Sequence, residues 1–287
     1  MLYIIIVLYK TKLEDSLTFK ALKKNLSLLK DLGSKILIYN NSPEIEIPQS
    51  NDYVIYTPTE NLMLAGAYNY ALQKAIENKA QWLLLLDQDT ELNQDYFERL
   101  NAFLNKTDVS TVYDVVVPTL SIGDKHLSPI AYYKSTGPFI SHLNKPLRNN
   151  EDVVQYVTNE GKNYAAFNSA SLLSIEILQR INGFDENYPL DMLDHKYYHL
   201  LNKLGAKIYI LDAHLKHTLS LLEKENTMSV TRYQGYIDKC FIFAKELGFT
   251  AVLVQKLRML ISVMANIIFS SKRKYFKASI SNLCRIK

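Results

Sequence analysis

The sequence predicts an α/β fold in which a mainly parallel sheet is flanked by helices on both faces. Short apolar runs alternate with segments of helical periodicity, and this alternation indicates βαβ units. The most informative run is Trp82–Leu86, which ends abruptly in Asp87 and Asp89. An uninterrupted apolar run of this length is typical of a strand that is buried on both faces.

Each expected element has its own signal in the sequence. Leu2–Tyr9 is apolar, has no basic region before it and is too short for a signal peptide, so we expect it to form the first strand. Further strands are expected at Lys35–Tyr39, Tyr53–Tyr56, Trp82–Leu86, Asp114–Pro118 and Lys207–Leu211. Helices are expected at Leu17–Leu29, Leu64–Ile76, Asn93–Leu104, Ile175–Ile181 and Asp191–Leu204. Residues 121–161 lack periodicity and predict irregular specificity loops, whereas the chain after Glu223 is helical in pattern.

Composition indicates a globular protein of a reducing compartment. The 287 residues are 48% hydrophobic and 22% charged, which is ordinary for a folded protein. The two cysteines, Cys240 and Cys284, have neither metal-binding spacing nor a disulfide pattern. We therefore expect a cytoplasmic protein.

Charge is distributed unevenly along the chain. From Thr250 onward there are eight cations and no acid, whereas the rest holds 25 cations against 29 acids. Such asymmetry favours a polyanionic partner or an anionic membrane surface. No nucleic-acid motif accompanies the cations, and the apolar stretch Met259–Phe269 is too short to span a bilayer. We expect an amphipathic helix on the membrane surface followed by Lys272, Arg273 and Lys274. The alternative is a core-packing helix with a solvated charged end.

Asp87 and Asp89 are the strongest candidate site residues. In open α/β sheets, ligands bind beyond the carboxyl ends of the strands. Two carboxylates at that position offer hard oxygen ligands for Mg²⁺ or Mn²⁺, which is commonly shared with substrate phosphates. The alternative is that they cap the helix expected at Asn93–Leu104, although a cap needs only one acid.

Two polar segments follow or precede other expected elements. Asn40, Asn41 and Ser42 follow a strand, where they could hydrogen-bond a nucleobase or form a common polar turn. The segment Asn61–Asn69 enters a helix through small residues, which favours either a phosphate at the helix N-terminus or close packing.

The second half of the chain holds three more candidates. Asp191 and Asp194 have the i, i+3 spacing of one helical face. One of them could act as a general base, or both could be first-turn acids favoured by the helix dipole. His217 follows a strand and could be a metal ligand or a surface histidine.

Taken in order, these motifs resemble the family 2 glycosyltransferases with the GT-A (Rossmann-like) fold, especially the bacterial rhamnosyltransferase-like branch. The resemblance covers about Leu2 to Ile242. It is carried by Asn40-Asn41-Ser42, Asn61, Gly66, Ala67 and Asn69, Asp87-Gln88-Asp89, the segment Asn168–Ser174, Gly183-Phe184-Asp185-Glu186, the segment Leu190–Asp194, and His217.

The resemblance implies an inverting, metal-dependent transferase that moves a sugar from a nucleotide diphosphate donor to an acceptor hydroxyl. It implies that Asp89 and His217 hold Mn²⁺ or Mg²⁺, with Asp87 beside them at the donor. Asp194 would be the catalytic base, with Asp191 as its helper. The remaining donor-binding residues would be Tyr9, Asn40, Asn41, Asn61 and Asn69, and the acceptor side would be lined by Ser169, Ala170 and Ser171.

The chain departs from the family pattern at several positions. Asn40 and Asn41 stand where an Asp is usual, and Leu62 replaces a common glycine. The Arg that often follows the base is absent, and Asp238-Lys239 stands where the rhamnosyltransferase branch has an Arg-Asn pair. These departures affect the acceptor and some diphosphate contacts more than the metal site or the base.

The expected organisation is a transferase domain at 1–222 and a basic helical extension at 223–287. Within the domain, residues 1–118 would bind the nucleotide sugar and residues 119–222 the acceptor. The donor would be dTDP-rhamnose or a UDP-hexose. The acceptor would be a glycan or lipid-linked glycan of cell-surface polysaccharide synthesis at the inner face of the plasma membrane, and a homo-oligomer stays open.

Two other classes are considered. The chain could be a non-catalytic subunit that binds a sugar nucleotide or a glycan for a partner transferase. A nucleotidyltransferase would also use two carboxylates on an α/β sheet, but it normally needs a glycine-rich loop after the first strand, and Tyr9–Lys12 contains no glycine.

Overall fold

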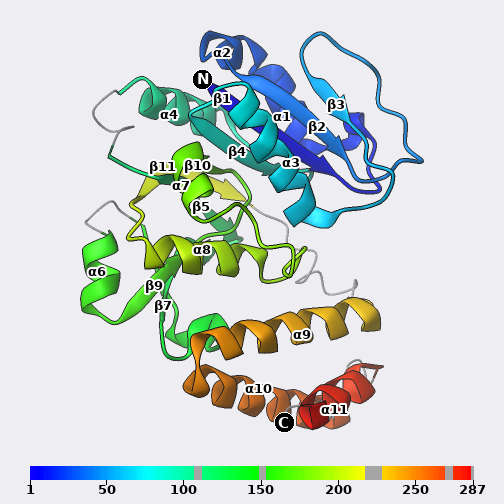
Figure 1. Ribbon diagram of the computed structural model, residues 1–287, viewed down its shortest axis with the longest axis vertical. Coiled ribbons are helices and arrows are strands. Elements are labelled where there is room, and N and C mark those ends of the chain that lie inside the picture. Colours follow the sequence, from blue (N-terminus) through cyan, green and yellow to red (C-terminus); the bar gives the residue numbers. More distant parts are fainter. Residues whose placement is uncertain (107–111, 149–152, 217–227, 269–273, 286–287) are drawn as a thin grey trace.

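A mixed sheet forms the centre of the protein in the computed structural model, which describes residues 1–106, 112–148, 153–216, 228–268 and 274–285 (Figure 1). Its strands are β1 (Leu2–Leu8), β2 (Lys35–Asn40), β3 (Val54–Tyr56), β4 (Trp82–Asp87), β5 (Val115–Ile122), β6 (Lys125–Ser128), β10 (Ser171–Ser174) and β11 (Ile208–Lys216). They lie in the order β11-β5-β10-β4-β1-β2-β3, with β6 beside β5. Only the pairings of β10 and β6 are antiparallel, so the predicted mixed, mainly parallel sheet is confirmed.

Helices cover both faces of this sheet because the side chains of each buried strand alternate between two cores. In β1, Ile4 and Ile6 contact the core under α1 (Leu17–Lys24), α2 (Leu26–Asp31) and α4 (Gln94–Leu104). Tyr3 and Ile5 contact the opposite core, under α3 (Met63–Glu77), α7 (Ile175–Arg180) and α8 (Leu193–Lys203). All seven residues of β1 are buried, as expected for a strand with helices on both sides.

The prediction of one helix over Leu17–Leu29 is wrong, because α1 and α2 are separate helices. Asn25 lies between them with φ −109° and ψ 14°, outside the helical region. Its side-chain amide donates a hydrogen bond to the Ala21 carbonyl at 3.0 Å. An Asn side chain that competes in this way for a backbone group favours a break in the helix.

The irregular region predicted at residues 121–161 is also wrong in large part. It contains β6, β7 (Ile130–Tyr133), β8 (Lys145–Pro146), two 3₁₀ turns (Gly137–Phe139 and Ser141–Leu143) and α6 (Val153–Asn159). A second, three-stranded sheet pairs β8, β7 and β9 (Lys162–Ala165) in that order. Strands of two to four residues are too short to show an alternating pattern, which explains the failure.

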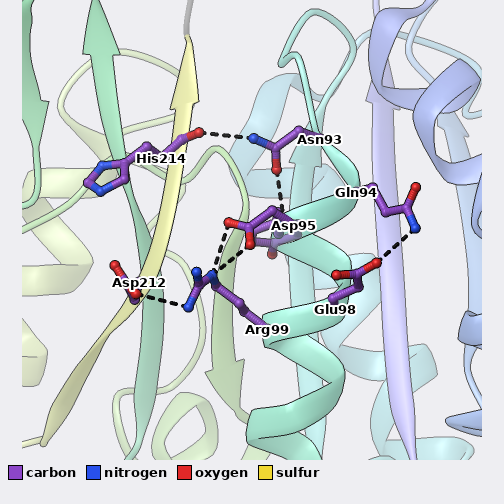
Figure 2. Close-up of polar contacts among 8 residues, drawn as sticks. Asn93, Gln94, Asp95, Glu98, Arg99, Asp212 and His214 are labelled. Atoms are coloured by element: carbon purple, nitrogen blue, oxygen red, sulfur yellow. Dashed lines mark hydrogen bonds and ion pairs between the residues drawn. The ribbon is translucent and has the colours of Figure 1, made fainter.

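β11 is longer than the strand predicted at Lys207–Leu211, and its pairing with β5 is interrupted. The register shifts between Ile210 and His214, opposite Pro118. Pro118 has no N–H to donate, so the ladder is broken there and resumes at His214. Figure 2 shows how α4 holds this second half of β11. Asn93 caps α4 and its amide donates to the His214 carbonyl at 3.1 Å, while Arg99 pairs with Asp95 and Asp212.

Three helices form the end of the molecule farthest from the N-terminal strands (Figure 1). They are α9 (Val230–Leu247), α10 (Phe249–Ile268) and α11 (Phe276–Arg285), in agreement with the helical pattern expected after Glu223. Phe243 of α9 packs into the core under α8, and Glu246 accepts hydrogen bonds from Tyr188 and Lys196. α10 lies on the outer side of α9 (Figure 1).

Candidate active site

The carboxyl ends of β1, β2 and β4 meet at one edge of the sheet. Val7 pairs with Asp87 across β1 and β4, and Leu8 pairs with Asn40 across β1 and β2. The strand order changes direction here, since β2 and β3 lie on one side of β1 and β4 lies on the other. Such a switch point leaves room for a ligand beyond the strand ends.

Asp87 is held in place by two hydroxyl groups. Its Oδ2 accepts a hydrogen bond from the Ser169 hydroxyl at 2.5 Å, and its Oδ1 accepts one from Thr90 at 3.2 Å. Ser169 is 2% exposed and precedes β10, the strand inserted beside β4. Asp87 therefore has a fixed orientation, which suits a contact that positions a ligand.

The loop after Asp87 is tied to the start of α1. The Gln88 side chain accepts from the Tyr9 N–H at 2.8 Å, and the Gln88 carbonyl accepts from the Ser16 hydroxyl at 2.7 Å. The Thr18 hydroxyl donates to the Thr90 carbonyl and accepts from the Thr90 N–H. Asp89 lies in this tethered loop and its side chain is exposed to solvent.

The donor set partly fits a divalent cation. Asp87 and Asp89 supply carboxylate oxygens of the kind that Mg²⁺ and Mn²⁺ prefer. In the parts of the chain that the structure describes, no group of three or more His, Cys, Asp or Glu side chains gathers to complete a site. A cation bound here would need further ligands from the donor diphosphate or from residues beyond those described.

His217 lies outside the described residues, so its role stays a prediction. The neighbouring residue, Lys216, ends β11 and forms an isolated antiparallel bridge with Glu91. Glu91 follows Asp89 by two residues, and Asn93 bonds the backbone of the same strand at His214 (Figure 2). The end of β11 is thus attached to the loop that carries the two aspartates.

Asn40 and Asn41 are buried and their side chains bond to the protein backbone. The Asn41 amide donates to the Met63 carbonyl and accepts from the Leu62 N–H. The Asn40 amide donates to the Ile45 carbonyl and accepts from the Ser42 N–H. The Asn41 amide connects the end of β2 to the start of α3, and the Asn40 amide shapes the loop after β2. Their contact with a nucleobase stays a prediction.

The other predicted donor-side residues have mixed environments. Tyr9 is 45% exposed at the end of β1. Asn61 accepts from the Met63 N–H at 2.8 Å, which fixes the entry to α3. Asn69 pairs through both ends of its amide with the backbone of Phe184. Gly183 is required there, because a Cβ at this position would lie 2.7 Å from the Asn69 Oδ1.

The segment Ser169–Ser171 lies directly beside Asp87. Ala170 has a left-handed backbone with φ 61°, and its carbonyl accepts from the Tyr96 hydroxyl at 3.0 Å. Ser171 is buried and its hydroxyl donates to the Phe167 carbonyl at 2.6 Å. The structure thus places the Ser169 hydroxyl against the Asp87 carboxylate, whereas the Ser171 hydroxyl is buried and bonded to the Phe167 carbonyl.

Asp191 and Asp194 are not on one helical face, because α8 begins at Leu193. Met192 has φ 65° and separates Asp191 from the helix. Burial raises the pKa of Asp191 and the charge of Asp194 raises it further, against the opposing effect of Arg232, whose Nη2 lies 3.8 Å away. The charge of one carboxylate therefore acts on the other, even though the helical argument that paired them is wrong.

Four buried tyrosines are under the electrostatic influence of Asp194, and sequence reasoning did not find them. Burial raises the pKa of Tyr68, Tyr132, Tyr197 and Tyr198, and the charge of Asp194 adds to each rise. Twenty tyrosines in the sequence were the only available signal, because their grouping depends on how α3, β7 and α8 pack.

Tyr68 connects this group to the strand ends. Its pKa is raised well above the usual value by burial, and the carboxylates of Asp87 and Asp194 both contribute to the rise. Its hydroxyl accepts a hydrogen bond from the Asn168 amide at 2.6 Å, one residue before Ser169. The charges of Asp87 and Asp194 therefore act on one buried hydroxyl, although the two residues are far apart in the sequence.

A separate open cavity of about 380 Å³ is lined in part by Asn69. Its lining includes Gly183, Asp185, Glu186 and Lys196. Of the predicted site residues that the structure describes, only Asn69 lines it, and the Asn69 amide is already bonded to Phe184. This cavity is not the site formed by the strand ends.

The fold is that of the GT-A glycosyltransferases. The protein is similar to the mannosyltransferase PcManGT from Pyrobaculum calidifontis in complex with GDP-Man and Mn²⁺, with 11% identity, a TM-score of 0.52, and coverage of 100% of this chain and 87% of the other. It is also similar to S. aureus TarS 1–349 in complex with UDP-GlcNAc, with 13% identity, a TM-score of 0.50, and coverage of 98% and 81%.

A family comparison agrees with this fold. Residues 36–164 match the model described as glycosyl transferase family 2, which supports the family predicted from the motifs. No curated protein sequence matches the chain. The rhamnosyltransferase-like branch stays a prediction.

Proposed function

We propose that this protein is an inverting glycosyltransferase that moves a sugar from a nucleotide diphosphate donor to the hydroxyl of a glycan acceptor. The observation that carries the proposal is the carboxylate of Asp87, which ends β4 at the switch point of the sheet and is oriented there by Ser169 and Thr90. Burial raises the pKa of Tyr68, and the charges of Asp87 and Asp194 both add to the rise. A donor-side carboxylate and a candidate base therefore both act electrostatically on one buried group. The family 2 match over residues 36–164 supports the reaction class.

On the donor side, we assign positioning to Asp87 and cation binding to Asp89. Asp87 is fixed by Ser169 and Thr90, so it can orient the ribose or the sugar. Asp89 is exposed in the tethered loop, and His217 is proposed as a further ligand. A bound Mn²⁺ or Mg²⁺ would neutralise negative charge on the leaving diphosphate. Tyr9, Asn40, Asn41, Asn61 and Asn69 shape the donor side.

On the acceptor side, we assign the general base to Asp194. Its carboxylate takes the proton of the acceptor hydroxyl while the acceptor oxygen forms a bond to the anomeric carbon. The bond from that carbon to the diphosphate oxygen breaks on the opposite face, so the configuration inverts and the nucleoside diphosphate leaves. Asp191 is the helper, since it pairs with Arg232 and its carboxylate is influenced by the charge of Asp194. Ser169, Ala170 and Ser171 are buried, so they would support the acceptor side from beneath.

For the donor, we propose a pyrimidine nucleotide sugar, with dTDP-rhamnose first and a UDP-hexose second. The related folds were solved with GDP-Man and with UDP-GlcNAc, so both of these donors belong in a test panel. The acceptor is proposed to be a glycan or lipid-linked glycan of cell-surface polysaccharide synthesis. Residues 1–118 and 119–222 would serve the donor and the acceptor respectively, with 223–287 as an extension.

A donor panel with and without Mn²⁺ tests the proposal. Thermal stabilisation and release of nucleoside diphosphate are measured for the wild type and for Asp89→Ala. A ligand at a hundredfold its Kd should stabilise the protein by about 2.7 kcal/mol. Asp89→Ala should lose Mn²⁺-dependent binding, and its turnover should fall by about 10²- to 10³-fold, the effect of removing one electrostatic contact to the leaving group. Gln94→Ala, on the exposed start of α4, is the control and should behave as wild type.

The outcomes separate the candidate functions. Tight donor binding without turnover on a broad acceptor panel would indicate the non-catalytic binding subunit. Full activity and unchanged nucleotide affinity in Asp89→Ala would contradict the cation assignment. Stabilisation by nucleoside triphosphates alone, without any sugar nucleotide, would favour a nucleotidyltransferase.

A further inference from the structure

The outer face of α10 is composed almost entirely of large apolar side chains. Nine positions of this helix are exposed, and Thr250 is the only polar residue among them. The other eight are Phe249, Leu253, Leu257, Leu260, Ile261, Met264, Ile267 and Ile268, which are 46% to 83% exposed. At 100° per residue these eight positions fall within one third of the helix circumference, so they form a continuous apolar stripe.

The inner face of α10 is the more polar of the two. Gln255 and Asn266 are 2% and 3% exposed, and the Asn266 amide donates to the Ser279 hydroxyl of α11 at 3.0 Å. Ser262 shares a hydrogen bond with Tyr233 of α9 at 2.9 Å. A surface helix of a water-soluble domain normally has the reverse arrangement, with apolar side chains inward. The helix is therefore suited to an apolar medium outside the protein.

Cations accompany the apolar stripe and acids are absent from this part of the chain. No Asp or Glu occurs from Thr250 to the last residue, whereas eight Lys and Arg do. Of these cations, Lys256 is half-buried on α10. Lys274 lies just before α11 and Lys277 lies in its first turn, and both are exposed. An apolar face with cations around it is complementary to lipid tails beneath anionic headgroups.

We propose that α10 binds an anionic lipid bilayer with its axis parallel to the surface and its apolar stripe in the interfacial layer. This inference does not depend on sugar transfer. The sequence already predicts an amphipathic helix on a membrane surface followed by a cationic cluster. The proposal adds which face of α10 is buried, which residues form it, and how the helix lies relative to the surface.

A spanning orientation is less compatible with the contacts of α10. The helix has 20 residues and a length of about 30 Å, enough to cross a bilayer. Its inner face, however, carries Arg258, which donates to Gln255 at 2.8 Å, and it packs against α9, which contains Asp238 and Lys239. Lipid cannot surround a helix whose inner side is covered by a charged neighbour.

A second copy of the chain is also a weaker candidate for the stripe. A face about 30 Å long and about 10 Å wide offers on the order of 300 Å². A stable protein interface buries about 800 Å² on each partner. The stripe alone is too small for a stable dimer, and the cations around it would repel those of an identical face.

Vesicle flotation with the full chain tests the proposal. Vesicles of equal parts phosphatidylglycerol and phosphatidylcholine should bind the wild type at low salt. Binding should weaken at least tenfold in 0.5 M salt or with phosphatidylcholine alone, because the cations contribute electrostatically. The double variant Leu257→Glu and Met264→Glu should lose at least tenfold in binding. Both side chains are about 60% exposed, so the fold should persist, as circular dichroism can verify.

The matched control adds the same two charges elsewhere on the surface. Leu17→Glu and Val54→Glu lie on α1 and β3 and are 42% and 61% exposed in the wild type. This control should bind vesicles as the wild type does. Equal loss in both double variants would mean that net charge and not the stripe governs binding, and would overturn the proposal.

Tryptophan depth measurements test the orientation. Leu257→Trp lies near the middle of α10 and Ile267→Trp near its end. With brominated lipids, a helix in the plane of the surface gives equal, shallow quenching at both positions. Much deeper quenching at position 257 would indicate a spanning helix and would overturn the in-plane proposal.

Two further results would overturn the inference. One is a wild type that ignores anionic vesicles at low salt. The other is a dimer in sedimentation equilibrium that Leu257→Glu with Met264→Glu converts to a monomer, since the stripe would then be a subunit interface.

Discussion

The edge of the sheet at Asp87 and the outer helix α10 use polar side chains in opposite ways. At the sheet edge, Asp87 and Asn41 each bond to two groups of the protein, which fixes the loops around the site. On α10 the polar side chains bond inward to α9 and α11, and the surface that remains is apolar. The bonds at the sheet edge hold the site residues in fixed positions, whereas the surface of α10 suits a surrounding medium that is itself apolar.

Because the two regions differ in this way, substitutions in each should change different properties of the protein. Substitutions at the sheet edge should change turnover and stability without affecting membrane binding. Substitutions on the α10 stripe should change membrane binding alone. A variant that affects both properties equally would show that the two regions do not act independently.

The largest expected effect is the loss of the proposed base. Asp194→Asn preserves size and hydrogen bonding but removes the proton acceptor, so turnover should fall by about 10²- to 10⁴-fold while donor binding persists. The measurement is release of nucleoside diphosphate under saturating donor and acceptor, with donor affinity measured separately.

Asp191→Asn is the matched comparison for this prediction. Asp191 lies outside α8 and beside Arg232, so its loss should cost less than that of Asp194. The reverse order of sensitivity would assign the base to Asp191. Unchanged turnover in both variants would contradict the proposed chemistry of this edge.

The next expected effect is on the pH dependence of stability, and it arises from His199, where α8 packs against α9. His199 of α8 is 7% exposed, lies against Phe243, and neither of its ring nitrogens has a hydrogen-bond partner among the described residues. Burial, with help from Lys203, lowers the pKa of His199 from 6.5 to about 4. Between these two values the unfolded chain binds a proton that the folded protein excludes. Stability should therefore fall as pH decreases, by about 2 kcal/mol between pH 7 and pH 5.

Urea unfolding at the two pH values measures this contribution. His199→Leu should lose about 2 kcal/mol less than the wild type between pH 7 and pH 5. His142→Leu removes an exposed histidine and should keep the wild-type pH dependence. Equal pH dependence in wild type and His199→Leu would mean that His199 is accessible to protons in the folded protein.

The smallest expected effect is at the support of Asp87. Ser169→Ala removes the hydroxyl that donates to Asp87 Oδ2, and hydrogen bonds to charged groups contribute about 1.5–3 kcal/mol. The Thr90 bond remains, so we expect a loss of about 1.5 kcal/mol in the free energy of unfolding and a weaker donor affinity. Ser141→Ala, on an exposed turn, should leave both values unchanged. A stable Ser169→Ala with normal donor affinity would show that Asp87 does not need this support.

The elements with long, uniform patterns could be predicted from the sequence. β1, β4 and α3 lie within one or two residues of the expected ranges, because each has one unbroken apolar pattern. The break at Asn25 could not be predicted, since it depends on a side-chain bond to the Ala21 carbonyl. The small sheet of β7, β8 and β9 was missed because its strands are very short.

The sequence predicts the two carboxylates of the site but not the residues that surround them. Asp87 and Asp89 are recognisable because they end a buried strand. The supporting Ser169 lies 82 residues away in the chain, and its contact with Asp87 exists only because β10 inserts beside β4. The wrong start of α8 has a similar cause, because the left-handed Met192 gives no sequence signal.

The insertion of β10 has a consequence for the order in which the protein folds. β4 pairs with β1 along one edge, but its other edge pairs with β10, where Leu84 opposes Leu172. A chain that has been synthesised only through β5 therefore leaves one edge of a fully apolar strand open. Open edges of this kind promote aggregation, and pairings distant in sequence form slowly. The segment 1–118 should consequently not be a stable fragment by itself, and the open edge of β4 is covered only when residues 171–174 have been synthesised.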